Sequence, residues 1–321
     1  MSRILTGIQS TGTPHLGNIL GAIIPAIELS KKSNESFLFI ADLHSLTQIK
    51  DAEELKENTY STAATWLAFG LNPQKTIFYK QSDIPITTEL AWILSSYYPY
   101  QRLTLAHSFK DKSNDLKNVN AALFTYPMLM AADILLYDAN YVPVGKDQIQ
   151  HLEITRNVAS KFNNLHGETL IIPEAITDEN TKLIIGTDGQ KMSKSKSNII
   201  NIFLSDKQLK KQIMSIKTDS LPIESIKNPN TCNVFKLYSL IGNEAQVKQM
   251  KENYEKGGYG YGEAKSQLFN LILETYSKQR NTYNYLMDNR SEIDQILKDG
   301  SIRAKKIADL VIKRVKSKLG I

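Results

Sequence analysis

Residues 37–42 read Phe-Leu-Phe-Ile-Ala-Asp, an unbroken apolar run that ends in an acid. Runs of this kind are typical of a strand that is buried on both faces of a parallel sheet. Similar short apolar segments lie on either side, at residues 4–8 and 76–79. Segments with helical periodicity separate the three, at residues 17–29 and 52–69. This alternation of strand and helix predicts a doubly wound α/β sheet.

The alternation is interrupted in the middle of the chain. Residues from about 85 to 139 have a mostly helical pattern, which predicts a helical insertion. The sheet pattern resumes with strands expected at residues 141–145 and 170–173, joined by a helix at 148–162. From residue 205 the pattern is helical to the end.

These patterns predict a Rossmann-like, doubly wound parallel-sheet domain with a helical insertion, followed by an all-helical C-terminal domain. We expect the sheet domain at residues 1–204, a helical domain at 205–292, and helices at 293–321 that pack back on the body. The glycine-rich run 257–262 has no strand before it, so it predicts a helix break and not a phosphate loop. The last helix has an apolar stripe made of Ala304, Ile307, Ala308, Val311, Val315 and Leu319.

Composition limits the possible functions. The 321 residues include 39 basic and 33 acidic side chains, a net charge of +6 that permits a polyanionic partner without requiring one. Cys232 is the single cysteine, which excludes a disulfide within the chain, a cysteine-rich zinc site and an iron–sulfur cluster. The sequence contains no run of about 18 apolar residues, so it predicts no membrane-spanning helix. The first residues resemble a strand and not a signal peptide, so we expect a cytoplasmic protein.

The first turn, residues 9–18, reads Gln-Ser-Thr-Gly-Thr-Pro-His-Leu-Gly-Asn and joins the first strand to the first helix. In open α/β sheets ligands bind at this edge, and a helix N-terminus offers N–H groups and a positive dipole end to phosphate. His15 and Asn18 are three residues apart and lie on one face of the first helical turn, where both can donate to phosphate oxygens. An ordinary strand-to-helix turn with a capping histidine is the alternative.

A second polar segment, residues 189–198, reads Gly-Gln-Lys-Met-Ser-Lys-Ser-Lys-Ser-Asn. It has little apolar periodicity and follows a turn signal. Lys191 and Lys194 are three apart with the Ser193 hydroxyl between them, which suits an anion such as a phosphate chain. A solvated lysine-serine loop is the other interpretation.

Taken together, His15-Leu16-Gly17-Asn18 and Lys191-Met192-Ser193-Lys194-Ser195 resemble the paired signature of the class I aminoacyl-tRNA synthetases. The second segment matches at all five positions, whereas the family's second histidine is Asn18 here. The resemblance implies that Lys191 and Lys194 stabilise the charge that develops on departing pyrophosphate. Electrostatic help of this kind is worth about 10²–10³ in rate per donor.

Two further segments, residues 124–137 and 142–151, resemble the tryptophanyl-tRNA synthetases, and the similarity covers nearly the whole chain. The residues themselves favour tryptophan. Tyr126, Met130 and Asp133 share one helix face. An ionised Asp133 can only accept a hydrogen bond and an indole N–H can only donate one, a pairing worth ~1.5–3 kcal/mol. A phenol could also donate to Asp133, and a mid-helix acid bonded to backbone or a lysine is the structural alternative.

The resemblance also implies a set of site residues. Those expected at ATP are Gln9, Ser10, Thr11, Gly17, Asn18, Gly145, Lys146, Asp147, Leu183, Lys191, Met192, Ser193, Lys194 and Ser195. Those expected at tryptophan are Leu5, Gly7, Gln9, His44, Tyr126, Met130, Asp133, Val142, Val144 and Gln148. The catalytic set is Lys191, Lys194, His15, Asn18 and Lys112, with Lys112 as a third phosphate contact or a solvated lysine. Two positions depart from the family: Leu5 replaces a common phenylalanine, and Lys146 replaces a common acid.

The implied reaction has two steps, activation of tryptophan by ATP to tryptophanyl-adenylate and transfer to tRNA(Trp). Mg²⁺ would be carried on the triphosphate, with no metal site, zinc or iron–sulfur cluster in the protein. The resemblance further implies a homodimer through the insertion and anticodon binding by residues 205–292. Three rivals remain: a tyrosine-specific synthetase, in which a glutamine usually replaces Met130, a small-molecule nucleotidyltransferase of the same superfamily, and a non-enzymatic RNA-binding protein.

Overall fold

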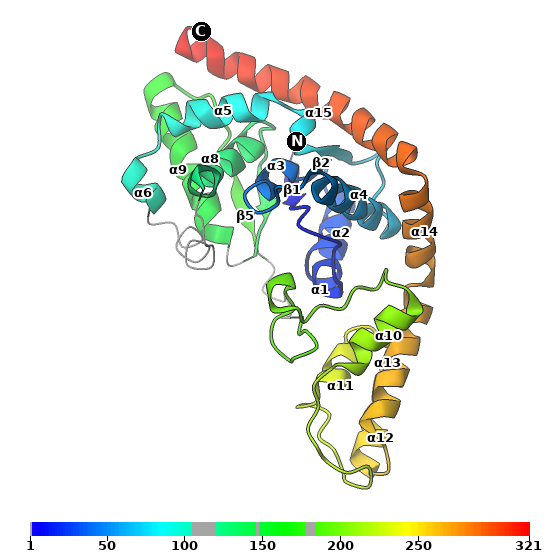
Figure 1. Ribbon diagram of the computed structural model, residues 1–321. Helices are drawn as coiled ribbons and strands as arrows, with labels where there is room; N and C mark the ends of the chain where they lie inside the picture. The colour runs from blue at the N-terminus through cyan, green and yellow to red at the C-terminus, as the bar shows by residue number, and fades with distance from the viewer. Residues whose placement is uncertain (1, 105–119, 146–147, 178–183) are drawn as a thin grey trace.

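The computed structural model describes residues 2–104, 120–145, 148–177 and 184–321 (Figure 1). Five parallel strands form one sheet in the order β3-β2-β1-β4-β5. Their bounds are β1 (Arg3–Ile8), β2 (Glu35–Ile40), β3 (Ile77–Lys80), β4 (Tyr141–Pro143) and β5 (Glu174–Ile176). The order runs outward from β1 in both directions, so the fold is doubly wound as the alternation predicts, with its switch point between β1 and β4.

Helices connect the strands and form the rest of the molecule. In the sheet half they are α1 (Leu16–Asn18), the π-helical turn η1 (Ile19–Ile23), α2 (Ile24–Lys32), α3 (Asp42–Ser45), α4 (Ala52–Ala68), the 3-10 turn η2 (Gln81–Asp83), α5 (Ile86–Ser95), α6 (Tyr100–Thr104), α8 (Ala121–Leu135), α9 (Ile149–His166) and the 3-10 turn η4 (Lys194–Lys196). Beyond them come α10 (Asp206–Met214), α11 (Asn233–Tyr238), α12 (Glu244–Lys256), α13 (Tyr261–Thr275), α14 (Ser277–Asp288) and α15 (Arg290–Leu319).

Two apolar cores lie on opposite faces of the sheet. One core joins Ile23, Leu38 and Trp66 to the helices α10–α14. The other joins Phe37 and Tyr79 to the helices α5, α8, α9 and α15. Strand β2 contributes to both because successive side chains of a strand point to opposite faces, which explains its continuous apolar run.

One predicted strand is wrong. Residues 170–173 are not a strand; the fifth strand is β5, which pairs with β4 from Tyr141 opposite Glu174. Leu170 is buried and its backbone N–H donates to the Asn163 side chain, but Ile171 and Ile172 are 42% and 40% exposed. The apolar run therefore leads into the edge of the sheet, and an apolar pattern alone could not separate the two positions.

The last helix, α15, crosses the body on the side of β3, as Figure 1 shows in red and orange. At Gly300 the helix touches the edge strand so closely that a Cβ would lie 1.7 Å from the carbonyl oxygen of Phe78. The Arg303 guanidinium donates to the Pro73 carbonyl at 2.8 Å. The glycine therefore lets a helix cover an edge strand that would otherwise expose unpaired backbone.

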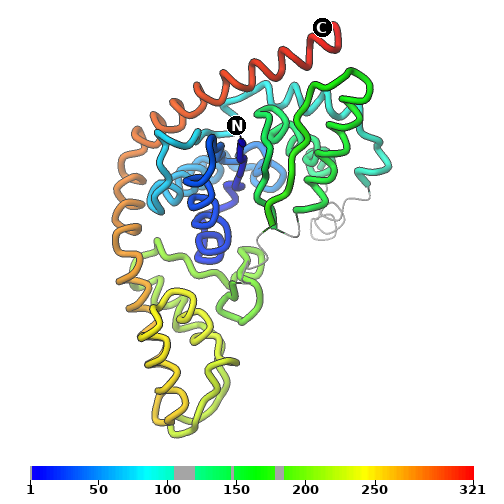
Figure 2. Tube along the Cα trace, turned by 180° about the vertical axis from the view of Figure 1, so that it is seen from behind, coloured from blue at the N-terminus to red at the C-terminus, as the bar shows by residue number. Residues whose placement is uncertain are grey.

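The helices α10–α13 form an elongated lobe that extends away from the sheet (Figure 2). Helix α14 joins this lobe to the body by packing along α4, where the Ser61 and Tyr283 hydroxyls lie 2.8 Å apart. At the start of α15, Arg290 forms a bidentate ion pair with Glu57. In the part of the chain that the structure describes, none of the helices is both long and apolar enough to cross a membrane.

Candidate active site

The carboxyl ends of the strands meet at one edge of the sheet, and the predicted site residues follow them. The first turn follows β1, His44 follows β2, and Val144 follows β4. The helix α8, capped by the Asn120 side chain on the Leu123 N–H at 3.0 Å, brings Tyr126 and Asp133 to the same edge. In an open α/β sheet this edge beside the switch point is where ligands bind.

The first turn ends in a reciprocal cap on α1. The Asn18 N–H donates to His15 Nδ1, and the His15 N–H donates to Asn18 Oδ1, both at 3.2 Å. The Leu16 N–H donates to the Ile200 carbonyl at 2.8 Å, which ties the helix start to the segment that follows residues 189–198, the lysine loop. The capping histidine predicted as an alternative is therefore present, and it fixes the orientation of both side chains.

His15 is neutral near pH 7. Burial, and then the positive charge of Lys194, lower the pKa of His15 to about 4. Because Nδ1 accepts the Asn18 N–H, the proton of the neutral ring sits on Nε2, where it can be donated to an anionic oxygen. A capping histidine and a phosphate donor are thus compatible roles for the same ring.

The lysine loop lies directly against the first turn, although 175 residues separate them. The Gly17 N–H donates to the Met192 sulfur at 3.3 Å, and Lys194 Nζ donates to the Gly12 carbonyl at 2.7 Å. Gly12 has a φ of +127°, and a Cβ there would lie 3.1 Å from Lys194 Nζ. The glycine both accepts a rare backbone conformation and makes room for the lysine.

The loop is held from within by one buried asparagine. Asn198, 2% exposed, accepts from the Ser193 N–H at 2.8 Å and donates to Asp188 at 2.7 Å and to the Lys191 carbonyl at 3.0 Å. Lys191 and Ser195 are exposed, whereas burial lowers the pKa of Lys194 to about 8. The loop therefore presents cations and hydroxyls on an ordered frame, which a merely solvated loop would not need.

Ser10 is fully buried. Its N–H donates to the Ser45 hydroxyl at 3.0 Å, and its own hydroxyl lies 3.2 Å from that of Ser45 and 3.3 Å from that of Thr59. This placement gives Ser10 a role in holding the first turn, and its contact with ATP stays a prediction. Its neighbours Gln9 and Thr11 are partly exposed on the same turn.

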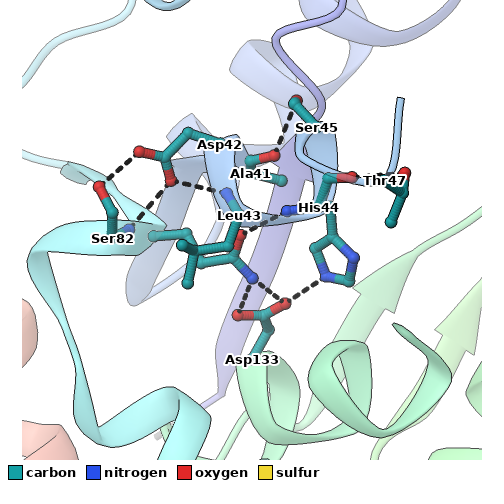
Figure 3. Close-up of polar contacts among 9 residues, drawn as sticks. Ala41, Asp42, Leu43, His44, Ser45, Thr47, Ser82 and Asp133 are labelled. Atoms are coloured by element: carbon teal, nitrogen blue, oxygen red, sulfur yellow. Dashed lines mark hydrogen bonds and ion pairs between the residues drawn. The ribbon is translucent and has the colours of Figure 1, made fainter. Parts of the chain in front are cut away.

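Asp133 lies in a buried polar cluster (Figure 3). Its Oδ2 is 2.9 Å from Nε2 of His44, and both of its oxygens accept from Nε2 of Gln81 at 2.8 Å. Burial raises the pKa of Asp133, while the bonds from His44 and Gln81 lower it. In the described part of the chain, Asp133 is therefore bonded to the side chains of His44 on α3 and Gln81 on η2, and not to backbone or a lysine as in the structural alternative.

Tyr126 lies beside this cluster. Its hydroxyl is hydrogen-bonded to Nε2 of His151, which is 1% exposed, and its ring packs edge-on to His44 with centroids 6.2 Å apart. His44 thus contacts both Tyr126 and Asp133, which agrees with the prediction that these two residues share one face of their helix.

The apolar residues predicted at the amino acid divide into two groups. Leu5 and Val142 are buried in the core of the sheet, whereas Met130 and Val144 pack against that core and remain partly exposed. Gly7 faces the Phe39 ring, whose atoms would lie 2.5–2.9 Å from a Cβ. The remaining described positions, Gly145 and Gln148, lie at the surface after β4 and at the start of α9, joined by a Gln148 N–H to Gly145 carbonyl bond of 2.9 Å.

Some predicted residues lie outside the described residues. These are Lys112, Lys146, Asp147 and Leu183. Two further residues, Gln81 and His151, contact Asp133 and Tyr126 and were not predicted from the sequence. Gln81 comes two residues after the strand predicted at 76–79, at the edge where ligands bind, and that position is the signal that could have found it.

The structure thus brings together the two segments that resemble the paired signature of the class I aminoacyl-tRNA synthetases. Comparison with known proteins agrees: residues 1–277 match the family model of the class I tRNA synthetases for tryptophan and tyrosine. The tryptophan–tRNA ligase of Campylobacter jejuni is 46% identical over 319 residues, 99% of this chain and all of the relative. That of Fusobacterium nucleatum is 46% identical over 322 residues, covering this chain fully and 98% of the relative.

A solved structure gives the same result. The crystal structure of the Campylobacter jejuni tryptophanyl-tRNA synthetase, complexed with ADP and tryptophan, superposes with a TM-score of 0.96 at 45% identity, covering 99% of this chain and 100% of that one. The chain belongs to the tryptophanyl-tRNA synthetase family, of the bacterial type.

Proposed function

We propose that this chain activates L-tryptophan with ATP, forming tryptophanyl-adenylate and pyrophosphate, and transfers the tryptophanyl group to tRNA(Trp) with release of AMP. The observation that carries the choice of amino acid is Asp133, a buried carboxylate held by donors on both oxygens at the ligand-binding edge. Such a group accepts hydrogen bonds only, and the indole N–H is a donor only.

At the nucleotide end, we assign the triphosphate to the space between the α1 N-terminus and the lysine loop. His15 Nε2–H and Asn18 would donate to phosphate oxygens, and Lys191 and Lys194 would follow the charge onto the leaving pyrophosphate. Lys194 already reaches the first turn through its bond to the Gly12 carbonyl. Binding of a phosphate oxygen would exchange that neutral acceptor for a charged one.

The chemistry requires no covalent intermediate on the protein. The tryptophan carboxylate attacks the α-phosphorus of ATP, a bond to pyrophosphate breaks, and the protein contributes position and electrostatic stabilisation. Gln148 and Tyr126 would hold the α-amino group, and Gln9 the carboxylate or the ATP. We assign Mg²⁺ to the triphosphate as part of the substrate. No group of three or more histidine, cysteine, aspartate or glutamate side chains suited to a metal ion occurs among the described residues.

The remaining assignments concern domains and partners. We propose residues 205–292 as the anticodon-binding domain, residues 1–204 as the catalytic domain and residues 293–321 as a brace on the body. The insertion at about 85–139 is proposed as the surface of a homodimer. Two large aromatic side chains of the insertion support this, Trp92 at 78% and Tyr100 at 66% exposure. The proposed compartment is the cytoplasm, where the tRNA substrate is charged.

Exchange of pyrophosphate into ATP, measured with tryptophan and tyrosine side by side, tests the proposal. Wild type should exchange with tryptophan, and Asp133→Ala should weaken that exchange. Exchange with tyrosine alone would keep the enzyme class and overturn the Asp133–indole assignment. No exchange with either, in a folded protein that binds ATP, would favour a small-molecule nucleotidyltransferase or a binding protein.

A further inference from the structure

Gln81 occupies the first position of the turn η2, directly after the edge strand β3, and is 1% exposed. Its side chain makes hydrogen bonds to two residues of the proposed amino-acid pocket, Asp133 and His44. Nε2 donates to Asp133 Oδ1 and Oδ2, each at 2.8 Å, and Oε1 accepts from the backbone N–H of His44 at 3.3 Å. A buried amide is costly unless satisfied, so this arrangement is specific.

The orientation of the amide follows from its neighbours. The His44 N–H is a donor and must face the amide oxygen, while a carboxylate is an acceptor and must face the amide nitrogen. The reverse orientation would bring Oε1 against two carboxylate oxygens. Both neighbours therefore require that Gln81 donates a hydrogen bond to Asp133 through its amide nitrogen.

The contact also fixes the plane of the Asp133 carboxylate. His44 Nε2 contacts Oδ2 and not Oδ1. A hydrogen bond to one oxygen leaves a broad range of values open to the terminal torsion angle of an aspartate. Gln81 is the one partner of Oδ1 among the described residues, and by touching both oxygens it removes that freedom. Hydrogen bonds weaken steeply as their angles bend, so the carboxylate plane decides how well an indole N–H is accepted.

We propose that Gln81 is a positioning residue that determines tryptophan specificity by setting the plane of the Asp133 carboxylate for the indole N–H. The inference rests on the proposed function of Asp133. Gln81 does not itself touch the amino acid in this account; it acts through Asp133.

The turn η2 is also held by contacts that do not involve the Gln81 side chain. The neighbouring Ser82 donates to the Asp42 carboxylate through both its N–H, at 3.0 Å, and its hydroxyl (Figure 3). The Ile84 N–H donates to the Gln81 carbonyl at 3.1 Å. The positioning role can therefore be separated from the fold, and Ser82→Ala is the matched control because it weakens the same turn without touching Asp133.

The test compares two substrates in pyrophosphate exchange: tryptophan and benzothienylalanine, in which sulfur replaces the indole N–H. Their ratio of kcat/KM measures the bond to Asp133 and cancels packing. Wild type should prefer tryptophan by about 10-fold or more. Gln81→Met should lose most of that preference through a higher KM for tryptophan, with the KM for ATP unchanged, and Ser82→Ala should retain the preference.

A preference that persists in a folded Gln81→Met protein, or an equal loss for both substrates, would overturn the inference. If Gln81→Met does not fold by circular dichroism, Gln81→Asn decides in its place, since it keeps a polar group but is too short to reach both oxygens; a preference retained there also overturns it. Failure of wild type to exchange with tryptophan at all would instead refute the proposed function, and the inference with it.

Discussion

In the proposed amino-acid pocket the key acid lies among buried partners, whereas at the proposed nucleotide site the lysines lie on a loop that is only partly buried. Asp133 is 3% exposed and its hydrogen bonds are made before any ligand arrives. Lys191 is exposed, and Lys194 makes one bond to a neutral carbonyl that a phosphate can replace. A selective site needs a fixed acceptor, because tilting it weakens the bond that distinguishes substrates. Charge stabilisation during pyrophosphate departure needs cations near the leaving group, and these can be carried by a loop.

The largest effect is expected from a substitution at the proposed nucleotide site, which should lower kcat. Lys194→Ala should lower kcat for tryptophan activation by about 10²–10³, because a cation that stabilises developing charge is lost. The KM for tryptophan should stay near the wild-type value in steady-state exchange. Lys196→Ala is the matched control, since Lys196 lies two residues further along and donates to Gln190 at 2.8 Å. A similar loss of kcat in both variants would contradict a specific role for Lys194.

The second effect belongs to the amino-acid pocket. Asp133→Asn should raise the KM for tryptophan by about 10- to 100-fold, because the charged acceptor for the indole N–H is lost. Exchange kinetics at saturating ATP measure it. Asp138→Asn is the control: this acid pairs with Arg314 outside the pocket, so its loss should leave the KM for tryptophan unchanged. An unchanged KM in Asp133→Asn would remove the basis for the tryptophan assignment.

The third prediction concerns the close packing of the C-terminal helix α15 on the edge strand β3. Gly300→Ala forces a Cβ against the Phe78 carbonyl, and overpacking of this kind costs about 1–3 kcal/mol. The matched helical glycine is Gly262, whose Cβ would meet no heavy atom within 4 Å. Gly262→Ala should stabilise the fold by up to ~1 kcal/mol. Denaturant unfolding of both variants measures the difference, and equal stabilities would show that α15 can shift without cost.

The smallest expected effect is a pH dependence that arises from Lys194 at the proposed nucleotide site. Burial lowers the pKa of Lys194 to about 8, so the lysine is charged below that pH and loses its charge above it. We therefore expect kcat/KM for ATP, which reports groups of the free enzyme, to decline as the pH rises through about 8. Lys194→Arg should abolish the decline, since a guanidinium stays protonated. A decline that persists in Lys194→Arg belongs to another group.

Much of the fold could be predicted from the sequence because its signals are local. Residues 37–40 of the apolar run are buried on both faces in β2, and the predicted strands at 4–8 and 76–79 match β1 and β3 closely. The strand predicted at residues 170–173 was wrong because an apolar run shows burial but not pairing. Leu170 is buried, yet the residues that pair with β4 begin at Glu174.

The site could be predicted where its residues lie in short motifs. Both signature segments are read directly, and the structure brings them into contact through Gly17 and Met192. The shared helix face of Tyr126 and Asp133 is also a local property. The bond between Gln81 and Asp133 spans 52 residues and depends on how β3 lies relative to α8, which no periodicity encodes. The reason for Ser10 being buried is likewise tertiary, since its partners Ser45 and Thr59 come from other elements.

Binding of tryptophan in the absence of ATP, measured by isothermal titration calorimetry on wild type, Lys194→Ala and Asp133→Asn, tests the division between the two regions most directly. Wild type and Lys194→Ala should have the same dissociation constant within about twofold, and Asp133→Asn should bind tryptophan about tenfold or more weakly. Loss of tryptophan binding in Lys194→Ala, or unchanged binding in Asp133→Asn, would contradict this division.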